Sequence, residues 1–521
     1  MFKKSLVVAL LLSTITGSYA SDEKEFKEWL KQYKKEFKTF VDEHDKEFAQ
    51  FLKANWVETE VEPEVKRDSK PKVTAPPKTK PEPIVEVEAD PQPVVLLPPA
   101  KPVEPVPPPE IVKKPDPVPS EPELVHKPTE PKPLPKPLPK PKPVVKPAPE
   151  QFVYVKKGES RTTVRMLGQT LVMPKLDAKP LGIRKLDSNT IADSWLSMAK
   201  TQFKDQVAAI KAAADDLALD DWGQALLTHE YLVSGSRLSK NDMQLYSWFY
   251  LVKQGFNSRV AYNDGKAYLM LSVKQKLFGQ KYFSLKDGKY YFVDLAEKQP
   301  ISVGSVYTYD KQHSSASEQV NIDLSVAPKH GTADKSRKLT TTIDNKSVTV
   351  STHYNSSYIE FLDHYPQLSM EYYFQAELPD GTKQELLNQL RPYILGMSEQ
   401  RALNVILHFV QKSLRYQTDQ QQFNYENYLF AGETIHYPYA DCEDRAVLFA
   451  YLVKNLLGNE VVGLQYDGHI ATAVAVKSDI QGDAFTVRGK RFVVADPTFI
   501  NANIGRTMTG YENQSPQIIS F

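Results

Sequence analysis

The sequence predicts an α+β protein built from several units, and three observations support this. Residues 22–56 are charged, free of Gly and Pro, and carry aromatic side chains at helical spacing. A proline-rich stretch follows, and from about residue 151 helix-like and strand-like patterns alternate to the end. With 521 residues, the chain is too long for one ordinary core. Lys+Arg (65) balances Asp+Glu (64), which gives no electrostatic case for nucleic acid.

The first twenty residues have the pattern of a secretory signal peptide. Lys3 and Lys4 precede a short apolar run, and residues 18–20 (Ser-Tyr-Ala) form a small-x-small cleavage site. The run is too short for a transmembrane helix, although an uncleaved anchor stays open as the alternative. We therefore expect residues 1–20 to be removed, no transmembrane segment thereafter, and a periplasmic or otherwise exported protein.

Two segments separate this leader from the folded part. Residues 21–60 predict an amphipathic, aromatic-rich helical segment; it packs on itself or self-associates as a coiled coil, or else docks on a partner or membrane. Residues 61–150 predict a stiff linker of polyproline-II type, because the window 63–149 holds 29 prolines and no glycine. The general interpretation of this segment is a spacer, and a more specific one is a ligand for a proline-recognising module.

The folded part divides into three predicted units: residues 151–300, an antiparallel β module at 301–385, and a final domain at 386–521. Strands are expected at 152–172 and 258–294, and three helices within 188–253, the first opened by Asp187. In the β module, "KSVTVSTHY" and "SMEYYFQAEL" are expected to be strands. A helix is expected at about 399–415.

The only cysteine of the chain, Cys442, stands at the start of a predicted helix. Asp441 is a suitable N-cap, and Gly458 stands where a C-terminal glycine ends a helix. An exported protein with one cysteine cannot form an intramolecular disulfide, so the thiol is either a buried inert group or a reactive one. The helix N-terminus favours the thiolate, so a lowered pKa of Cys442 is expected.

Two further residues complete a candidate catalytic set with Cys442. His469 opens one predicted strand, and Asp496 closes the next, just before Pro497-Thr498. A nucleophile, a base and a residue that orients the base are the groups that thiol catalysis needs. A metal site at Cys442 and His469 is a poor alternative, because two ligands fall short of the usual three or four. No metal or other cofactor is expected.

This set resembles the transglutaminase-like branch of the papain-type thiol enzymes over roughly residues 395–505. The family pattern is a cysteine opening a helix, Gly-His on a strand and a strand ending in Asp-Pro-Thr, and the flanking "DCEDRA" resembles a bacterial exported subgroup. The chain departs from the pattern with Ala440-Asp441 before the cysteine and Ile470-Ala471 after the histidine. The second departure removes an aromatic that often lines the substrate site, which leaves specificity open.

The resemblance implies a papain/transglutaminase-like fold for the last domain and a role for each residue of the set. Cys442 attacks an amide carbonyl, His469 is the base, and Asp496 orients the imidazole. The oxyanion would be held by the Cys442 backbone N–H and a second donor, for which Tyr437 and Tyr439 are candidates. The expected substrates are peptides or proteins of the cell envelope, and hydrolysis is favoured slightly over cross-linking.

Residues 151–300 resemble a degenerate copy of this domain. Both regions contain Tyr-Leu-Val-Lys, then a glycine turn before a strand, and each ends with an Asp-terminated strand. Aligned, Asn241 stands at Cys442, Lys266 at His469 and Asp294 at Asp496, with chance similarity as the alternative. Such a copy lacks nucleophile and base. The rival to an enzyme is therefore a non-catalytic binding or tethering protein in which both copies recognise a partner and the triad is vestigial.

Overall fold

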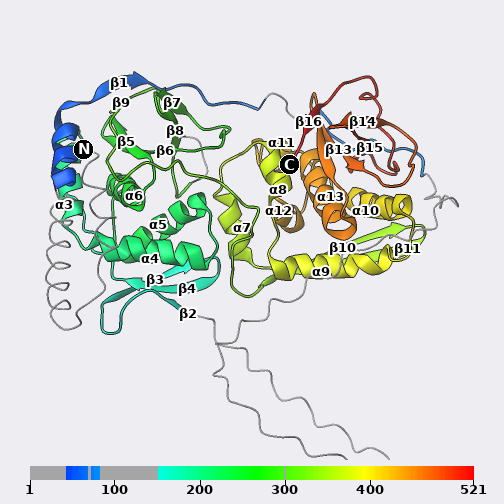
Figure 1. Cartoon of the computed structure of the whole chain (residues 1–521), viewed down its shortest axis with the longest axis horizontal. Helices are drawn as coiled ribbons and strands as arrows, with labels where there is room; N and C mark the ends of the chain where they lie inside the picture. Colours follow the sequence, from blue (N-terminus) through cyan, green and yellow to red (C-terminus); the bar gives the residue numbers. More distant parts are fainter. Residues whose placement is uncertain (1–42, 68–71, 82–150, 298–300) are drawn as a thin grey trace, which may run out of the picture.

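The computed structural model describes residues 43–67, 72–81, 151–297 and 301–521. The predicted signal peptide, the first part of the aromatic segment and most of the proline-rich linker lie outside these residues. Figure 1 shows the described chain as two lobes side by side: an upstream lobe (residues 43–60 and 151–323) and a downstream lobe (residues 335–521). Helix makes up 34% and strand 25%, which confirms the mixed α+β class.

The upstream lobe contains four helices between residues 188 and 254, where the sequence predicted three. They are α3 (Ser188–Ala199), α4 (Phe203–Asp216), α5 (Asp221–Gly235) and α6 (Lys240–Gln254). The missed helix is α4, whose buried face consists largely of alanines and therefore gives a weak hydrophobic period. The predicted start of α3 is confirmed, because the Asp187 carboxylate accepts from the Thr190 N–H at 3.0 Å.

Two sheets complete the upstream lobe. The larger, antiparallel sheet has the order β1 (Val57–Glu60), β9 (Ser305–Thr308), β5 (Ser258–Asn263), β6 (Lys266–Ser272), β8 (Gly288–Val293) and β7 (Tyr282–Leu285). The smaller has the order β2 (Gln151–Val153), β4 (Gln169–Pro174) and β3 (Arg161–Met166). Strand β9 joins this lobe from beyond residue 300, so the predicted boundary at 300 was too early.

The downstream lobe has helices on a five-stranded antiparallel sheet. The sheet order is β14 (Ala484–Val487), β15 (Lys490–Ala495), β13 (His469–Ala475), β12 (Val461–Tyr466) and β16 (Gln517–Ile519). The helices are α7 (Ser356–Asp363), α8 (Met370–Gln375), α9 (Asp380–Leu390), α10 (Glu399–Ser413), α11 (Asp419–Gln422), α12 (Ala431–His436) and α13 (Cys442–Leu457), with a 3₁₀ turn at Arg391–Tyr393. The predicted glycine at the end of α13 is confirmed by the left-handed Gly458, with φ 69°.

The predicted β module at 301–385 was only partly right. "KSVTVSTHY" is strand β11 (Lys346–Tyr354), which pairs with β10 (Lys335–Ile343) in a hairpin. "SMEYYFQAEL", however, contains the helix α8, because Met370, Tyr373 and Phe374 bury one helical face. Helices α9 and α10 pack on the hairpin, so the region belongs to the downstream lobe and is not a separate β unit.

The two lobes repeat one strand order. β9-β5-β6-β8-β7 in the upstream sheet corresponds to β16-β12-β13-β15-β14 in the downstream sheet, and α6 packs on β6 as α13 packs on β13. The registers also agree: Leu269 pairs with Val293 in one sheet, and Thr472 with Ala495 in the other. This shared topology supports the duplication that the sequence suggested.

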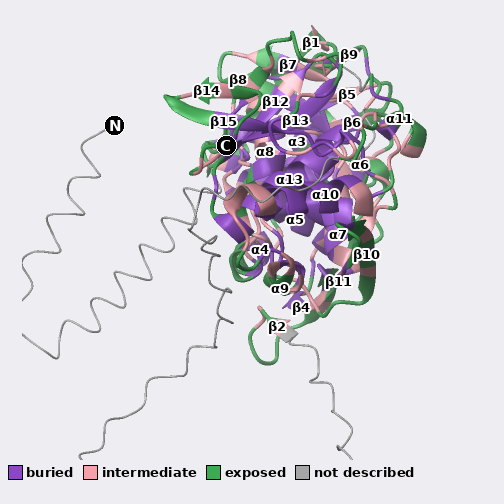
Figure 2. Ribbon diagram, turned by 90° about the vertical axis from the view of Figure 1, so that its right-hand side faces the viewer, coloured by how far each residue is buried: buried purple, intermediate pink, exposed green. Residues whose placement is uncertain are grey.

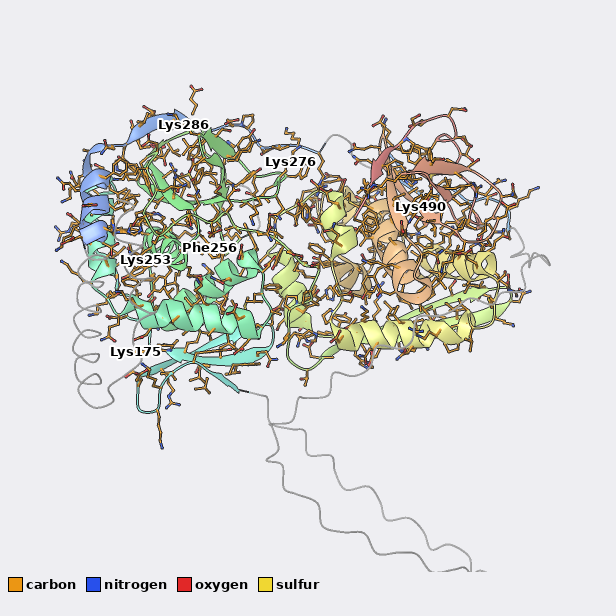
Figure 3. All side chains as sticks on the ribbon, viewed as in Figure 1. Lys175, Lys253, Phe256, Lys276, Lys286 and Lys490 are labelled. Atoms are coloured by element: carbon orange, nitrogen blue, oxygen red, sulfur yellow. The ribbon has the colours of Figure 1, made fainter. Side chains whose placement is uncertain are left out.

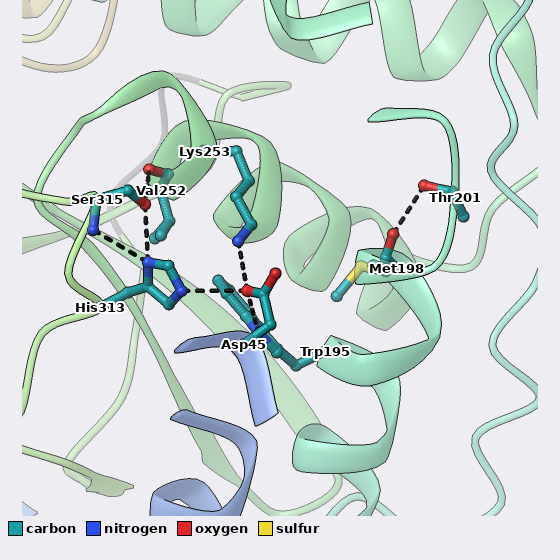
Figure 4. A network of polar contacts seen from close by, with 8 residues as sticks. All are labelled: Asp45, Trp195, Met198, Thr201, Val252, Lys253, His313 and Ser315. Atoms are coloured by element: carbon teal, nitrogen blue, oxygen red, sulfur yellow. Dashed lines mark hydrogen bonds and ion pairs between the residues drawn. The ribbon is translucent and has the colours of Figure 1, made fainter. Parts of the chain in front are cut away.

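The described part of the aromatic helical segment, residues 43–54, is built into the upstream lobe. Its Phe48 and Leu52 are buried in the main core. Figure 4 shows Asp45 at the centre of a buried polar network, where its carboxylate accepts from Trp195 Nε1 at 3.1 Å and from His313 Nε2 at 3.1 Å and pairs with Lys253. Residues 43–54 are therefore an intramolecular element, and docking or self-association remains a prediction only for residues before 43.

The side chain of Lys253 is buried, unlike those of the other lysines labelled in Figure 3. Figure 3 places Lys253, in the last turn of α6, in the upstream lobe, whereas Lys490 lies on the downstream lobe. The Lys253 side chain is 4% exposed and that of Lys490 is 59% exposed. Burial alone raises the pKa of Asp45, yet the His313 hydrogen bond and the Lys253 charge bring it below its ordinary value. The ion pair of Asp45 with Lys253 thus ties residues 43–54 to α6 through one carboxylate oxygen, Oδ1.

The chain then crosses from one lobe to the other, which the proline-rich composition did not predict. Figure 1 shows the blue N-terminal chain running from β1 toward the downstream lobe. Arg67 lies over the rings of Phe278 in the upstream lobe and Tyr428 in the downstream lobe, at 4.6 and 3.4 Å. Residues 72–81, called the strap from here on, pack on the downstream lobe. The predicted role of residues 61–150 as a spacer before the folded part was therefore wrong for the described residues 61–67 and 72–81, and the rest of that range lies outside the described residues.

One main hydrophobic cluster runs through both lobes, and it includes Trp195 upstream and Leu448 downstream. Figure 2 shows these buried elements at the centre of the molecule, with exposed residues at the rim. Within the described ranges, no helix combines the length and the apolar character needed to cross a membrane.

Candidate active site

The fold brings His469 and Asp496 into direct contact. His469 is the first residue of β13, and Asp496 follows the last residue of the neighbouring strand β15. His469 Nε2 lies 2.8 Å from Asp496 Oδ2, and both side chains are buried. The other Asp496 oxygen accepts from the backbone N–H groups of Thr498 at 2.9 Å and Phe499 at 3.2 Å. The Asp-Pro-Thr turn therefore holds the carboxylate in a fixed position against the imidazole.

The second imidazole nitrogen is available for proton transfer. His469 Nδ1 is buried and accepts or donates no hydrogen bond within the described residues. Cys442, the first residue of α13, lies against the same strand, because the backbone N–H of Ile470 is directed at its sulfur. The predicted Cys442 thus lies next to the strand that His469 opens, Asp496 holds one nitrogen of the imidazole, and the other nitrogen has no partner among the described residues.

The predicted lowering of the Cys442 pKa is wrong for this structure. Burial raises the pKa of the thiol well above its ordinary value, and the charges of Glu443 and Asp441 raise it further. The sulfur lies 2.9 Å from Glu443 Oε2 and donates to it. The helix N-terminus does favour a thiolate, but two carboxylates one residue away outweigh it. The structure therefore holds a neutral thiol.

Buried carboxylates gather behind Cys442, and the sequence analysis did not identify them as a group. Oxygens of Asp419, Asp441 and Glu443 lie within 4.8 Å of one another. Burial raises the pKa of Asp419 and Asp441, and the charge of their acidic neighbours adds to it. Asp441 Oδ1 and Glu443 Oε1 are buried without a hydrogen-bond partner. Three such oxygens suit a hard divalent cation. The sequence analysis considered only cysteine and histidine as metal ligands, so it did not identify this cluster.

A buried arginine fixes the backbone that leads to Cys442. The Arg445 guanidinium donates to the carbonyls of Ala440 at 3.1 Å, Gln411 at 3.1 Å and Leu414 at 3.0 Å. Burial lowers the pKa of Arg445 to about 10. The contacts join the start of α13 to the end of α10, so they set where the cysteine lies.

Gln411 performs the equivalent task for Asp496. Its side-chain amide donates to the carbonyls of Asp496 and Ala502, at 3.0 Å each, and its oxygen accepts from the Asn501 N–H at 3.1 Å. The two ends of the candidate site are therefore tied to the same stretch of α10. A buried glutamine inside a helix gave no signal of this role in the sequence.

The two predicted oxyanion donors differ in their position. The Tyr437 hydroxyl is directed at Asp363, 2.9 Å from both carboxylate oxygens, so it is engaged away from the triad. Tyr439 is half-buried, and its backbone forms a parallel bridge with Arg415. The structure thus gives no support to the Tyr437 hydroxyl as an oxyanion donor.

A different tyrosine, Tyr416, lies at the site. Burial raises its pKa, and among the charges that raise it further Cys442 is the largest. A second, Tyr511, packs on the His469 ring with centroids 5.0 Å apart. Neither stands in a recognisable motif, so the sequence gave no means of finding them.

The strap covers this centre. The Lys72 N–H donates to the carbonyl of Gly468 at 2.8 Å, directly before His469. The carbonyl of Val73 accepts from the Tyr416 hydroxyl. The Val73 side chain is buried in a small apolar cluster with Phe499, Ala502 and Met508, packed by Tyr416 and Tyr511. Cys442 is 1% exposed under this cover.

The upstream lobe preserves the geometry of the site without its chemistry. Asn241 Oδ1 accepts from the Ala267 N–H at 2.9 Å, as Cys442 faces the N–H of Ile470, so Asn241 does stand at the cysteine position. Lys266 opens β6 as His469 opens β13, and Asp294 follows β8 as Asp496 follows β15. Lys266 is exposed and Asp294 half-buried. An amide and an exposed ammonium cannot act as nucleophile and base.

Comparisons with known proteins identify no relative: no family model, curated protein or solved structure matches the chain.

Proposed function

We propose that the protein is an exported thiol enzyme of the transglutaminase-like class that hydrolyses amide bonds of envelope peptides or proteins. The observation that carries this proposal is the state of His469: Nε2 is held by Asp496 at 2.8 Å, Nδ1 is buried without a partner among the described residues, and the N–H of the next residue, Ile470, meets the Cys442 sulfur. Most buried polar atoms have a hydrogen-bond partner, so a buried imidazole nitrogen without one calls for an explanation. A catalytic histidine needs a free nitrogen for the nucleophile's proton.

The reaction proceeds in two halves. In the first, Nδ1 of His469 takes the thiol proton while the Cys442 sulfur attacks the carbonyl carbon of the amide. The C–N bond then breaks, the imidazolium gives its proton to the leaving amine, and a thioester on Cys442 remains. In the second, water attacks the thioester with His469 again as base, which releases the acid and restores the thiol. An amine in place of water would give a cross-link.

The other groups serve these steps. Asp496 stabilises the imidazolium and fixes the tautomer in which Nε2 carries the proton and Nδ1 is free to accept one. The backbone N–H of Cys442, in the first turn of α13, has no intrahelical acceptor and is suited to the oxyanion. Tyr416 replaces Tyr437 as the candidate for a second donor, because it lies beside Cys442.

The test looks for the covalent intermediate. The full chain is incubated with a mixture of envelope proteins, quenched in acid, and analysed for a thioester adduct on Cys442 and for new N-termini. The wild type and a Val73→Gly chain are both used, because Val73 packs over the site. Cys442→Ala and His469→Ala should abolish both signals, whereas His353→Ala, an exposed histidine elsewhere in the lobe, should leave them unchanged.

Either of two results would refute the proposal. Cleavage that persists in Cys442→Ala would mean that another protein is responsible. The absence of adduct and cleavage from both the wild type and Val73→Gly would leave the rival function, a binding or tethering protein with a vestigial triad.

A further inference from the structure

The contacts of the strap are those of a bound peptide. Besides the bonds at residues 72 and 73, the strap pairs in parallel with the segment after Asp496: the Thr79 N–H donates to the Ile500 carbonyl and the Ile500 N–H to the Pro77 carbonyl, at 3.0 Å each. The Asn501 side chain also donates to the Thr79 carbonyl at 3.0 Å. All of these use the strap's backbone, as when a binding cleft receives an extended peptide.

The strap's side chains contribute little beyond one anchor. Val73 is the one buried strap residue, at 9% exposure, while Lys72, Thr74, Ala75, Lys78 and Lys80 are exposed. The Lys72–Asp467 ion pair is also exposed, so it adds little to the affinity. The downstream lobe therefore holds the strap by its backbone and by one branched apolar side chain.

The anchored point lies over the catalytic set. Val73 contacts a cluster formed by residues just after Asp496 and by the tyrosines beside Cys442 and His469. Its neighbour Lys72 is bonded to the residue before His469. The strap thus touches the segments that carry the candidate base and its aspartate.

We propose that residues 72–80 occupy the substrate cleft of this enzyme, so that the chain is held closed by its own segment and the substrate is an extended peptide with a valine-like residue in the Val73 pocket. This rests on the proposed function. The polar partner of the Val73 carbonyl, Tyr416, is then the group that meets a substrate carbonyl. Displacing the strap opens the cleft without altering either lobe's core.

The experiment displaces the strap in the full chain and measures how fast Cys442 reacts with an alkylating reagent. Val73→Asp places a charge in the apolar pocket, and Val73→Gly removes the anchor without adding charge; the second guards against misfolding of the first. Val57→Asp, at an exposed valine of β1, is the matched control. The rate of Cys442 alkylation by iodoacetamide at one fixed pH should rise about tenfold or more in both Val73 variants and stay unchanged in the control.

A second measurement asks whether the strap and substrate share one cleft. A synthetic peptide of residues 70–81, added to the Val73→Gly chain, should return the alkylation rate to the wild-type value, and the same peptide with Val73→Asp should not. Hydrolysis of envelope peptides should follow the alkylation rate.

The outcomes separate the two proposals. Faster alkylation that the peptide reverses, without any hydrolysis, would uphold the strap in the cleft and refute the enzyme. Equal alkylation and equal hydrolysis in the wild type and both Val73 variants would refute the closed cleft and leave the enzyme standing. Faster alkylation that the peptide does not reverse would show a loosened lobe and overturn the shared cleft.

Discussion

Replacing Arg445 with methionine tests whether the buried guanidinium holds the candidate site in place. Methionine keeps much of the side-chain volume but has no donors, so the carbonyls of Ala440, Gln411 and Leu414 lose their bonds at 3.0–3.1 Å. A buried polar group left unsatisfied costs about 1–3 kcal/mol. Part of the loss is relieved by water, so we expect the downstream lobe to lose about 3–5 kcal/mol of unfolding free energy, a large part of a typical domain's stability.

The chain offers separate intrinsic probes for its two lobes. The four tryptophans of the described residues, at positions 56, 195, 222 and 248, all lie in the upstream lobe, so their fluorescence reports that lobe. The single thiol, Cys442, is buried in the downstream lobe, so its reaction with a thiol reagent reports unfolding there. In a urea titration, Arg445→Met should shift the thiol transition to lower urea and leave the fluorescence transition nearly unchanged. Lys454→Met, an exposed change on the same helix, is the control and should cost less than about 0.5 kcal/mol.

An unchanged thiol transition in Arg445→Met would contradict this reasoning, because it would mean that the three carbonyls find other partners at no cost. Equal shifts of both transitions would show instead that the lobes unfold as one unit, as their continuous hydrophobic cluster allows.

Three further predictions concern other buried charges. Asp45→Ala should destabilise the upstream lobe by about 3–5 kcal/mol, because it removes the carboxylate paired with buried Lys253. The loss should be measured as a lower urea midpoint of tryptophan fluorescence. The control Asp193→Ala, which breaks an exposed pair with Lys53, should cost under about 1 kcal/mol. Burial lowers the pKa of His408 from 6.5 to about 4, so its neutral form contributes stability that is present above pH 6.5 and lost as the pH falls toward 4. When thermal unfolding is measured at several pH values, His408→Asn should remove up to about 3 kcal/mol of this pH dependence. An unchanged dependence of stability on pH would contradict the lowered pKa of His408. Millimolar Ca²⁺ should bind the oxygens of Asp419, Asp441 and Glu443 and thereby raise the melting temperature of the protein. Glu443→Gln should reduce this increase. A melting temperature that does not change with Ca²⁺ would mean that these oxygens hold no cation.

The positions of the candidate triad could be predicted from sequence, whereas its electrostatics could not. A helix start, a tight turn before His469 and an Asp-Pro pair are local signals, and each of them has a matching element in the structure. The pKa of Cys442 depends on how many buried carboxylates surround it, and Asp419 comes from a helix 23 residues away. Only the fold shows that these acids converge.

Two errors of secondary structure have local causes. The stretch containing Met370, Tyr373 and Phe374 alternates well enough to suggest a strand, but its apolar residues also fit a short helix, and burial against the lobe decides between them. The alanine-rich α4 was missed because alanine carries little hydrophobic signal, although it is the best helix former.

The composition of the strap gave no indication that it contacts the downstream lobe. Residues 72–81 read as the beginning of an extended linker, whereas in the structure they bend at residues 74–75 and then pair with the segment after Asp496. The partner of the strap's backbone lies more than 340 residues away, as the bond between Tyr416 and Val73 shows. No periodic pattern encodes a contact of that separation.

That separation also sets an order of events during synthesis. Thr79 and Asn501, which are bonded in the finished protein, lie 422 residues apart, so at about 5–20 residues per second the ribosome needs roughly 20–80 s to make the second after the first. The strap is therefore made long before the segment with which it pairs. Until the segment around Asn501 has been made, residues 77–79 of the strap have no backbone with which to pair.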